Sequence, residues 1–233
     1  HLSNIHAREA FRQTSLLAYA SRGFEQGFVD ASLGWGQGSL EQSRVARFAA
    51  VTDDESLEAV DVLAADSDTD LLTATLSAGW DWQQGATSFG PRAALEYSRF
   101  EIDAFSERAT EGSDAFAVAI DRQAIRSLIA RLGGSAQRAI STRWGVLLPQ
   151  FDAAWVLQFE DEAESLRGRF VNDPAGTAFL LPGGAVDGRY GEAGLTLAWL
   201  RAGGSSGFLS YRRLFGLEDT SQAYWSLGLR LEF

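Results

Sequence analysis

Hydrophobic and polar residues alternate through most of this chain. The pattern is clearest at the end, where Trp225, Leu227, Leu229, Leu231 and Phe233 alternate with Ser, Gly, Arg and Glu. Successive side chains of a β-strand point to opposite faces, so this stretch predicts a strand with one wholly apolar face. The same period recurs upstream and predicts about nine strands, over residues 12–22, 27–48, 69–84, 88–105, 120–137, 141–164, 187–201, 206–216 and 222–233.

The polar face of these strands differs from that of an ordinary soluble sheet. It combines small residues with single charges of both signs, which suits the inside of a narrow, water-filled barrel, while the apolar face suits lipid. Glu192 falls on this polar face. The charges that we expect to line the lumen are Asp30, Asp81, Arg92, Glu96, Arg131, Asp152, Glu160 and Arg230. Tryptophans close to strand ends predict a membrane-interface girdle, made of Trp35, Trp80, Trp82, Trp144, Trp155 and Trp199.

The connections between the predicted strands alternate in length. The short ones lie at 23–26, 84–87, 138–140 and 202–206, and the long, mostly acidic ones lie at 49–68, 106–119 and 165–186, whereas the last connection on the long side, 217–221, is short. Short periplasmic turns and long external loops are typical of outer-membrane barrels. The sequence therefore predicts an all-β, transmembrane antiparallel β-barrel in the outer membrane of a Gram-negative bacterium, in contact with the lipid bilayer and lipopolysaccharide.

Composition narrows the chemistry that this chain could perform. It has 233 residues, no cysteine and two histidines, His1 and His6, so thiolate and imidazole chemistry are nearly excluded from its body. The net charge of −11 disfavours nucleic acid as a partner. The chain does not begin with methionine, so we expect a processed product or part of a longer precursor. We expect no cofactor.

Two stretches partly match a catalytic or a metal-binding motif, but each lacks residues that the motif requires. Gly203–Gly207 matches Gly-x-Ser-x-Gly, but no histidine follows it in the chain, so we interpret it as a turn. Asp66–Asp70 begins like a calcium loop, yet Leu71 and Ser77 stand where glycine and glutamate are required. A solvated acidic loop is the simpler interpretation. A barrel phospholipase would need a Ser–His pair on its wall, and no predicted strand carries a histidine.

Several stretches resemble the C-terminal translocator barrels of bacterial autotransporters, the type V secretion proteins. The stretches are Gly90–Tyr97 with Phe105–Glu107, Gln123–Gly133, Leu148–Glu162, Tyr211–Gly216 and Leu229–Phe233. The resemblance covers residues 12–233 and leaves 1–11 as an N-terminal stub of unclear structure. It implies a twelve-stranded barrel, preceded by an α-helix that joins an exported passenger. It also implies that the barrel-assembly machinery reads the last strand through Trp225, Leu227, Leu229, Leu231 and Phe233.

The resemblance implies a protein that anchors and exports a passenger and is not itself catalytic, with any enzymatic activity in the passenger. Self-cleavage of the linker stays open. The chain shows about nine strands, so either residues 1–11 hold another strand, or a separate N-terminal piece completes the barrel, or the chain is a fragment. A structural or adhesive outer-membrane barrel without a passenger is the alternative function, and a soluble lipocalin-like barrel is a third interpretation.

Overall fold

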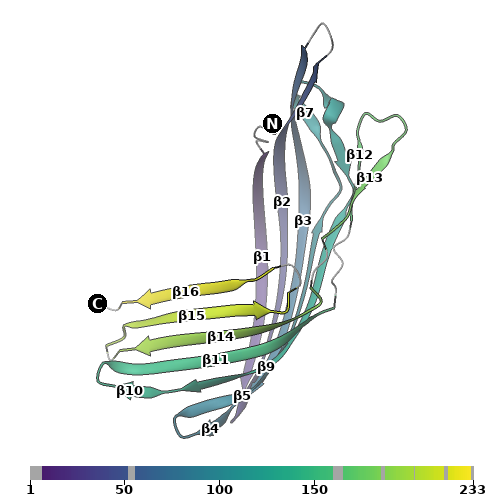
Figure 1. Cartoon of the computed structure of the whole chain (residues 1–233). Coiled ribbons are helices and arrows are strands. Elements are labelled where there is room, and N and C mark those ends of the chain that lie inside the picture. The colour runs from purple at the N-terminus through teal and green to yellow at the C-terminus, as the bar shows by residue number, and fades with distance from the viewer. Residues whose placement is uncertain are drawn as a thin grey trace.

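The computed structural model describes residues 7–51, 56–159, 165–184, 187–201, 203–217 and 220–231. Nine long strands form one antiparallel sheet in chain order, as Figure 1 shows. They are β1 (Ala7–Gly23), β2 (Gly27–Val51), β3 (Ser56–Trp80), β5 (Thr87–Ile102), β9 (Gln123–Arg138), β11 (Gly145–Gln158), β14 (Arg189–Leu200), β15 (Ser206–Phe215) and β16 (Ala223–Arg230). Three short strands extend the sheet: β4 (Trp82–Gln84) pairs with β5, β7 (Arg108–Glu111) with β3 and β10 (Ile140–Thr142) with β11.

The predicted strands are all present, but some begin earlier than the alternation indicated. β1 starts at Ala7 rather than at residue 12, and β3 starts at Ser56, where it pairs with Val51. The prediction of a loop over 49–68 was therefore wrong. Alternation marks a strand only where one face is apolar, and β3 carries carboxylates at Asp66, Asp68 and Asp70 on the face that is apolar further along the strand.

The other two long connections are also more ordered than the sequence predicted. β6 (Phe105–Ser106), β8 (Val118–Ile120), β12 (Leu166–Phe170) and β13 (Ala178–Leu181) form a second sheet in the order β13-β12-β8-β6, and η1 (Asp114–Phe116) precedes β8. Figure 1 places β7, β12 and β13 at the same end of the molecule as the β2–β3 hairpin. The long connections therefore build one small structure at one end of the main sheet.

The turn between β12 and β13 is closed by one carboxylate. Asp173 accepts hydrogen bonds from the backbone N–H of Thr177 at 2.7 Å and of Ala175 at 2.9 Å. These bonds, first that of Thr177, hold the pKa of Asp173 below its ordinary value.

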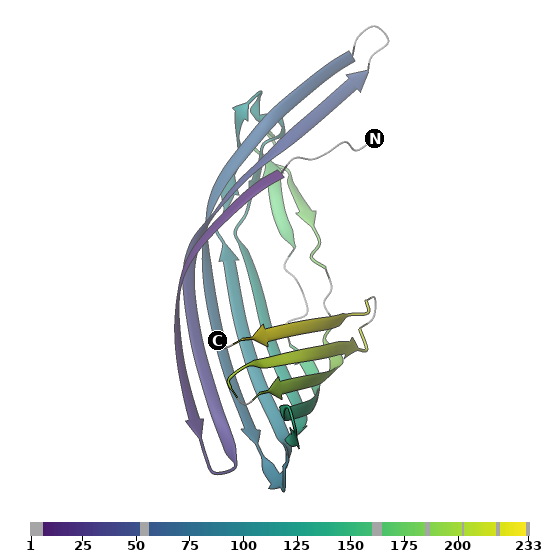
Figure 2. The ribbon, with the colours of Figure 1, turned by 90° about the vertical axis from the view of Figure 1, so that its left-hand side faces the viewer.

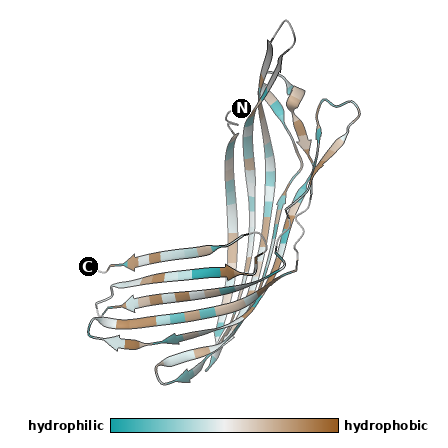
Figure 3. Ribbon diagram, in the orientation of Figure 1, coloured by the Kyte–Doolittle hydropathy of each residue, from teal (hydrophilic) through white to brown (hydrophobic). Residues whose placement is uncertain are grey.

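The main sheet has one apolar and one polar face. The register places Leu33, Leu76, Leu132, Leu195 and Leu227 on the same side, which we call the apolar face, and the opposite side is the polar face. Figure 3 shows hydrophobic and hydrophilic residues alternating along β11, β14 and β15. Few large side chains are fully buried in the described residues, among them Leu63 and Val156, so this sheet is not packed around an ordinary core.

The sheet is strongly twisted and is not closed. Figures 1 and 2 show β14, β15 and β16 lying across the direction of β1, β2 and β3. β1 and β16 end the strand order, and in the described ranges they do not pair with each other. Because nine antiparallel strands alternate in direction, β1 and β16 run the same way. An odd number of further strands would let the two edges close with antiparallel pairs, as lipid requires of backbone groups.

Gly90 in β5 sits where two backbones meet. A Cβ built on it would overlap the carbonyl oxygen of Trp80, which accepts a 2.9 Å hydrogen bond from Arg92 Nη1. We therefore expect Gly90→Ala to lower the free energy of unfolding by about 1–2 kcal/mol, because the β3–β5 contact must open. Urea unfolding of the full-length protein in detergent micelles measures this. Gly23→Ala is the control, since nothing lies within 4 Å of its added Cβ; equal unfolding midpoints for the two variants would contradict the expectation.

Candidate functional site

A connected group of charges crosses the polar face of five neighbouring strands. Glu96 of β5 forms an ion pair with Arg131 of β9, and Arg131 Nε lies 3.6 Å from Glu192 Oε1 of β14. Arg212 Nη1 of β15 lies 3.7 Å from the other oxygen of Glu192, and its Nη2 donates a 2.9 Å hydrogen bond to Asp152 Oδ2 of β11. We call these five residues the charge cluster. Glu192 joins its two halves, and its side chain is only 10% exposed.

The charge cluster borders a hollow of about 380 Å³ on the polar face. Small residues make the space, and the lining includes Ala94, Gly133 and Ala154. Gly194 has the same effect, because a Cβ built on it would lie 2.8 Å from Asp152 Oδ1. The small residues therefore leave room for charged groups and water at the middle of the sheet.

Three more of the predicted charges are held nearer the short turns. Arg92 Nη2 donates a 2.5 Å hydrogen bond to Asp81 Oδ1, and its guanidinium carbon lies 5.4 Å from the centre of the Phe28 ring. Asp30 accepts a 2.5 Å hydrogen bond from the hydroxyl of Ser21 on β1. Carboxylates along the polar face are therefore hydrogen-bonded to donors that lie close to them on the same face.

The structure brings only part of the predicted set together. Arg230 lies on the polar face of β16 but is not in the charge cluster, and Glu160 lies outside the described residues. Arg212 was missed by the sequence analysis. Its strand carries Phe208 and Leu214 on the same face, which hides the alternation that would have marked Arg212 as a polar-face residue. That these charges face a lumen stays a prediction.

The predicted aromatic residues fall on the apolar face or in the turns. Trp35 is opposite Leu72, Trp155 is opposite Leu132 and Trp199 is opposite Leu147. Four of the six lie near the short turns: Trp80, Trp82, Trp144 and Trp199. From Trp144 to Trp155 the chain advances by eleven residues. At about 3.3 Å per residue and a tilt of about 45°, that advance spans about 25 Å, the height of an apolar membrane band. The spacing supports an interface girdle, which stays a prediction.

The predicted assembly strand lies at the edge of the sheet. Trp225, Leu227, Leu229 and Leu231 are each exposed by about 70% (69%, 72%, 73% and 72%). The first three share the apolar face with β15, and Phe233 lies outside the described residues. This row of exposed side chains needs an apolar environment.

A buried carboxylate fastens the small sheet to the long β2–β3 hairpin. Glu107, only 5% exposed, accepts hydrogen bonds from Arg44 Nε at 2.6 Å, from Arg44 Nη2 at 2.7 Å and from the Val118 N–H at 2.9 Å. Arg44 Nη2 also donates to the carbonyl oxygen of Phe116 at 2.9 Å. One ion pair therefore holds both ends of the 107–118 connection.

Glu107→Gln is expected to loosen this connection, because the bidentate ion pair becomes a single hydrogen bond from the Arg44 guanidinium to an uncharged amide oxygen. Cleavage of the folded protein in detergent micelles by a protease within 107–118 should become several times faster, which mass spectrometry of the released peptides measures. Glu41→Gln is the matched control, since its pair with Arg12 is exposed at 49% and 76%. Equal cleavage rates in both variants would show that the Arg44–Glu107 pair does not fasten the connection.

No helix in the described part of the chain is long and apolar enough to cross a membrane. Within the described ranges, no three His, Asp or Glu side chains gather so that they could hold a metal ion.

A twisted antiparallel sheet with one apolar face and one face of paired charges is typical of the wall of a transmembrane outer-membrane β-barrel. The model of the family described as autotransporter β-domain matches residues 6–212. The chain belongs to this family, whose members serve in general as outer-membrane translocators. No curated protein matches the sequence.

Proposed function

We propose that this chain anchors an N-terminal passenger segment in the outer membrane and exports it to the cell surface. The charge cluster carries this proposal. Its two arginines are shared among three carboxylates, so its charges are largely neutralised within the wall. Paired charges and small residues keep such a wall hydrated. Because the charges are paired, none of them would bind a passing polypeptide strongly.

The two faces and the two ends of the sheet suggest which molecules the protein contacts during export. The apolar face suits the bilayer, and the end with the long connections suits contact with lipopolysaccharide and the exterior. The exposed row on β16 suits recognition by the barrel-assembly machinery. In the described ranges the outer edges of β1 and β16 pair with no other strand, which supports a barrel completed by further N-terminal strands, on the same chain or on a separate one, with the passenger's helix inside.

Protease treatment of intact cells that make the full-length protein tests the export step. We expect peptides from sequence upstream of residue 1 in the supernatant, while residues of β5, β9 and β11 stay protected in the membrane. Lysed cells are the control for full access. Absence of upstream peptides from intact cells would overturn the proposal and would favour an outer-membrane barrel with acidic loops and no passenger.

A further inference from the structure

The short turns of β10–β11 and β14–β15 border an open hollow of about 770 Å³. Its lining is aromatic and basic, and consists of Thr142, Arg143, Trp144, Gly145, Trp199 and Arg201. We call it the turn-side hollow. It lies at the opposite end of the strands from the long connections.

Gly145 brings the two turns together. The Thr142 hydroxyl donates a 2.8 Å hydrogen bond to the carbonyl oxygen of Gly145 and accepts one of 3.2 Å from the Trp144 N–H, which fixes the first turn. Gly145 has a φ of +136°, and a Cβ on it would overlap the Leu200 carbonyl oxygen and lie 3.0 Å from the Cα of Arg201. Close backbone contact therefore places Arg143 and Arg201 beside one hollow.

The two arginines of the hollow differ from those of the polar face. The guanidinium carbon of Arg143 lies 4.2 Å from the centre of the Trp144 ring. In the part of the chain that the structure describes, no carboxylate forms an ion pair with Arg143 or Arg201, whereas Arg92 and Arg131 both have one. Two unneutralised guanidinium groups beside one space favour an anion with several oxygen acceptors.

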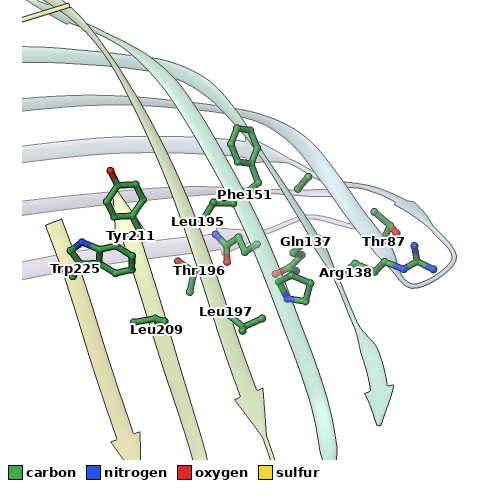
Figure 4. Close-up of a pocket in the computed structure, with 13 residues that line it drawn as sticks. Thr87, Gln137, Arg138, Phe151, Leu195, Thr196, Leu197, Leu209, Tyr211 and Trp225 are labelled. Atoms are coloured by element: carbon green, nitrogen blue, oxygen red, sulfur yellow. The ribbon is translucent and has the colours of Figure 1, made fainter. Parts of the chain in front are cut away.

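An apolar groove of about 520 Å³ adjoins the hollow on the apolar face. Figure 4 shows it running from Trp225 and Tyr211 past Leu195 and Leu197 toward Arg138. Leu197 lines the groove and Trp199 lines the turn-side hollow, and the two residues lie two positions apart on the same face of β14, so the two spaces are neighbours. The ligand that fits both spaces has an anionic head and a long apolar tail.

We propose that the turn-side hollow and the groove bind one anionic glycerophospholipid. Its phosphate lies between the guanidinium groups of Arg143 and Arg201, and an acyl chain follows the groove toward Tyr211. The inference rests on the proposed function, which puts the short turns in the periplasm and the hollow in the inner leaflet of the outer membrane. That leaflet position selects a phospholipid over lipopolysaccharide, and the two cations select an anionic head over a zwitterionic one.

Native mass spectrometry of the full-length protein tests the site directly. The protein is taken from outer membranes into nanodiscs that contain dioleoylphosphatidylglycerol and dioleoylphosphatidylcholine in equal amounts, and the retained lipids are counted. We expect one phosphatidylglycerol to be retained in preference to phosphatidylcholine. The double variant Arg143→Gln, Arg201→Gln should reduce this preference at least about tenfold, because each cation contributes near the headgroup.

Arg22→Gln is the matched control, since Arg22 lies at another short turn, with its guanidinium carbon 5.5 Å from the Phe24 ring. An unchanged preference in the double variant, an equal loss in Arg22→Gln, or equal retention of both lipids would overturn the lipid site. If intact cells display the passenger and the barrel is folded in the nanodisc, but the preference for phosphatidylglycerol is absent, only this inference falls. If the full-length protein does not fold in the bilayer, it falls together with the proposed function.

Discussion

Replacing Phe233 with serine is expected to reduce the amount of folded barrel in the outer membrane at least about tenfold, because the closing strand is no longer recognised and its edge stays unpaired in lipid. The apolar residues before Phe233 are open to recognition, because Trp225, Leu227, Leu229 and Leu231 are all highly exposed. Outer-membrane fractions compared by the heat-dependent mobility of the protein measure the effect.

Ser226→Ala is the control for this terminal strand, because Ser226 lies on the polar face of β16 opposite Ser210. It should insert as the unmodified protein does. Normal insertion and normal surface display of the Phe233→Ser variant would show that the terminal row is not an assembly signal.

Glu192→Leu should give the second large effect, a fall of about 2–3 kcal/mol in the free energy of unfolding. Arg131 and Arg212 would each lose one carboxylate, in a part of the sheet where their side chains are 27% and 46% exposed. Removing one partner from a partly buried network costs more than removing an exposed pair, and the exposure of the arginines keeps the loss below that of a fully buried ion pair. Urea unfolding of the full-length protein in micelles measures it.

Glu192→Gln separates charge from shape, since it keeps the size of the side chain and can accept a hydrogen bond from one arginine. We expect about half of the loss. Asp30→Asn is the matched control outside the charge cluster, because Asp30 bonds only Ser21 among the contacts of the described residues. If Glu192→Leu were as stable as Asp30→Asn, the cluster would not be a connected network.

The nine strands could be predicted because a membrane band imposes strict alternation, and this band reaches from about Gly27 to Trp35 on β2. Beyond the band polar and apolar residues are mixed on both faces of β2 and β3, so the period of two disappears although the backbone pairing continues to Val51 and Ser56. The second sheet was missed for another reason. Its four strands are only two to five residues long, and β8 pairs with β12, which is far from it in the sequence.

The candidate site could be predicted in its residue types and only partly in its members. Glu96, Arg131 and Asp152 follow from the polar-face period, but their connection through Glu192 to Arg212 depends on the order of five strands. Likewise, the turn-side hollow depends on the backbone contact of Gly145 with Leu200. No local pattern contains that contact.

Peptide mapping of the native protein from isolated outer membranes, before and after denaturation, tests the translocator assignment most directly. We predict that peptides from an upstream segment travel with residues 1–233, as one polypeptide or as a tightly held second piece that denaturation releases. The upstream piece would supply the strands that close the sheet between β1 and β16. Recovery of residues 1–233 alone, as a folded barrel with no upstream partner, would contradict the account.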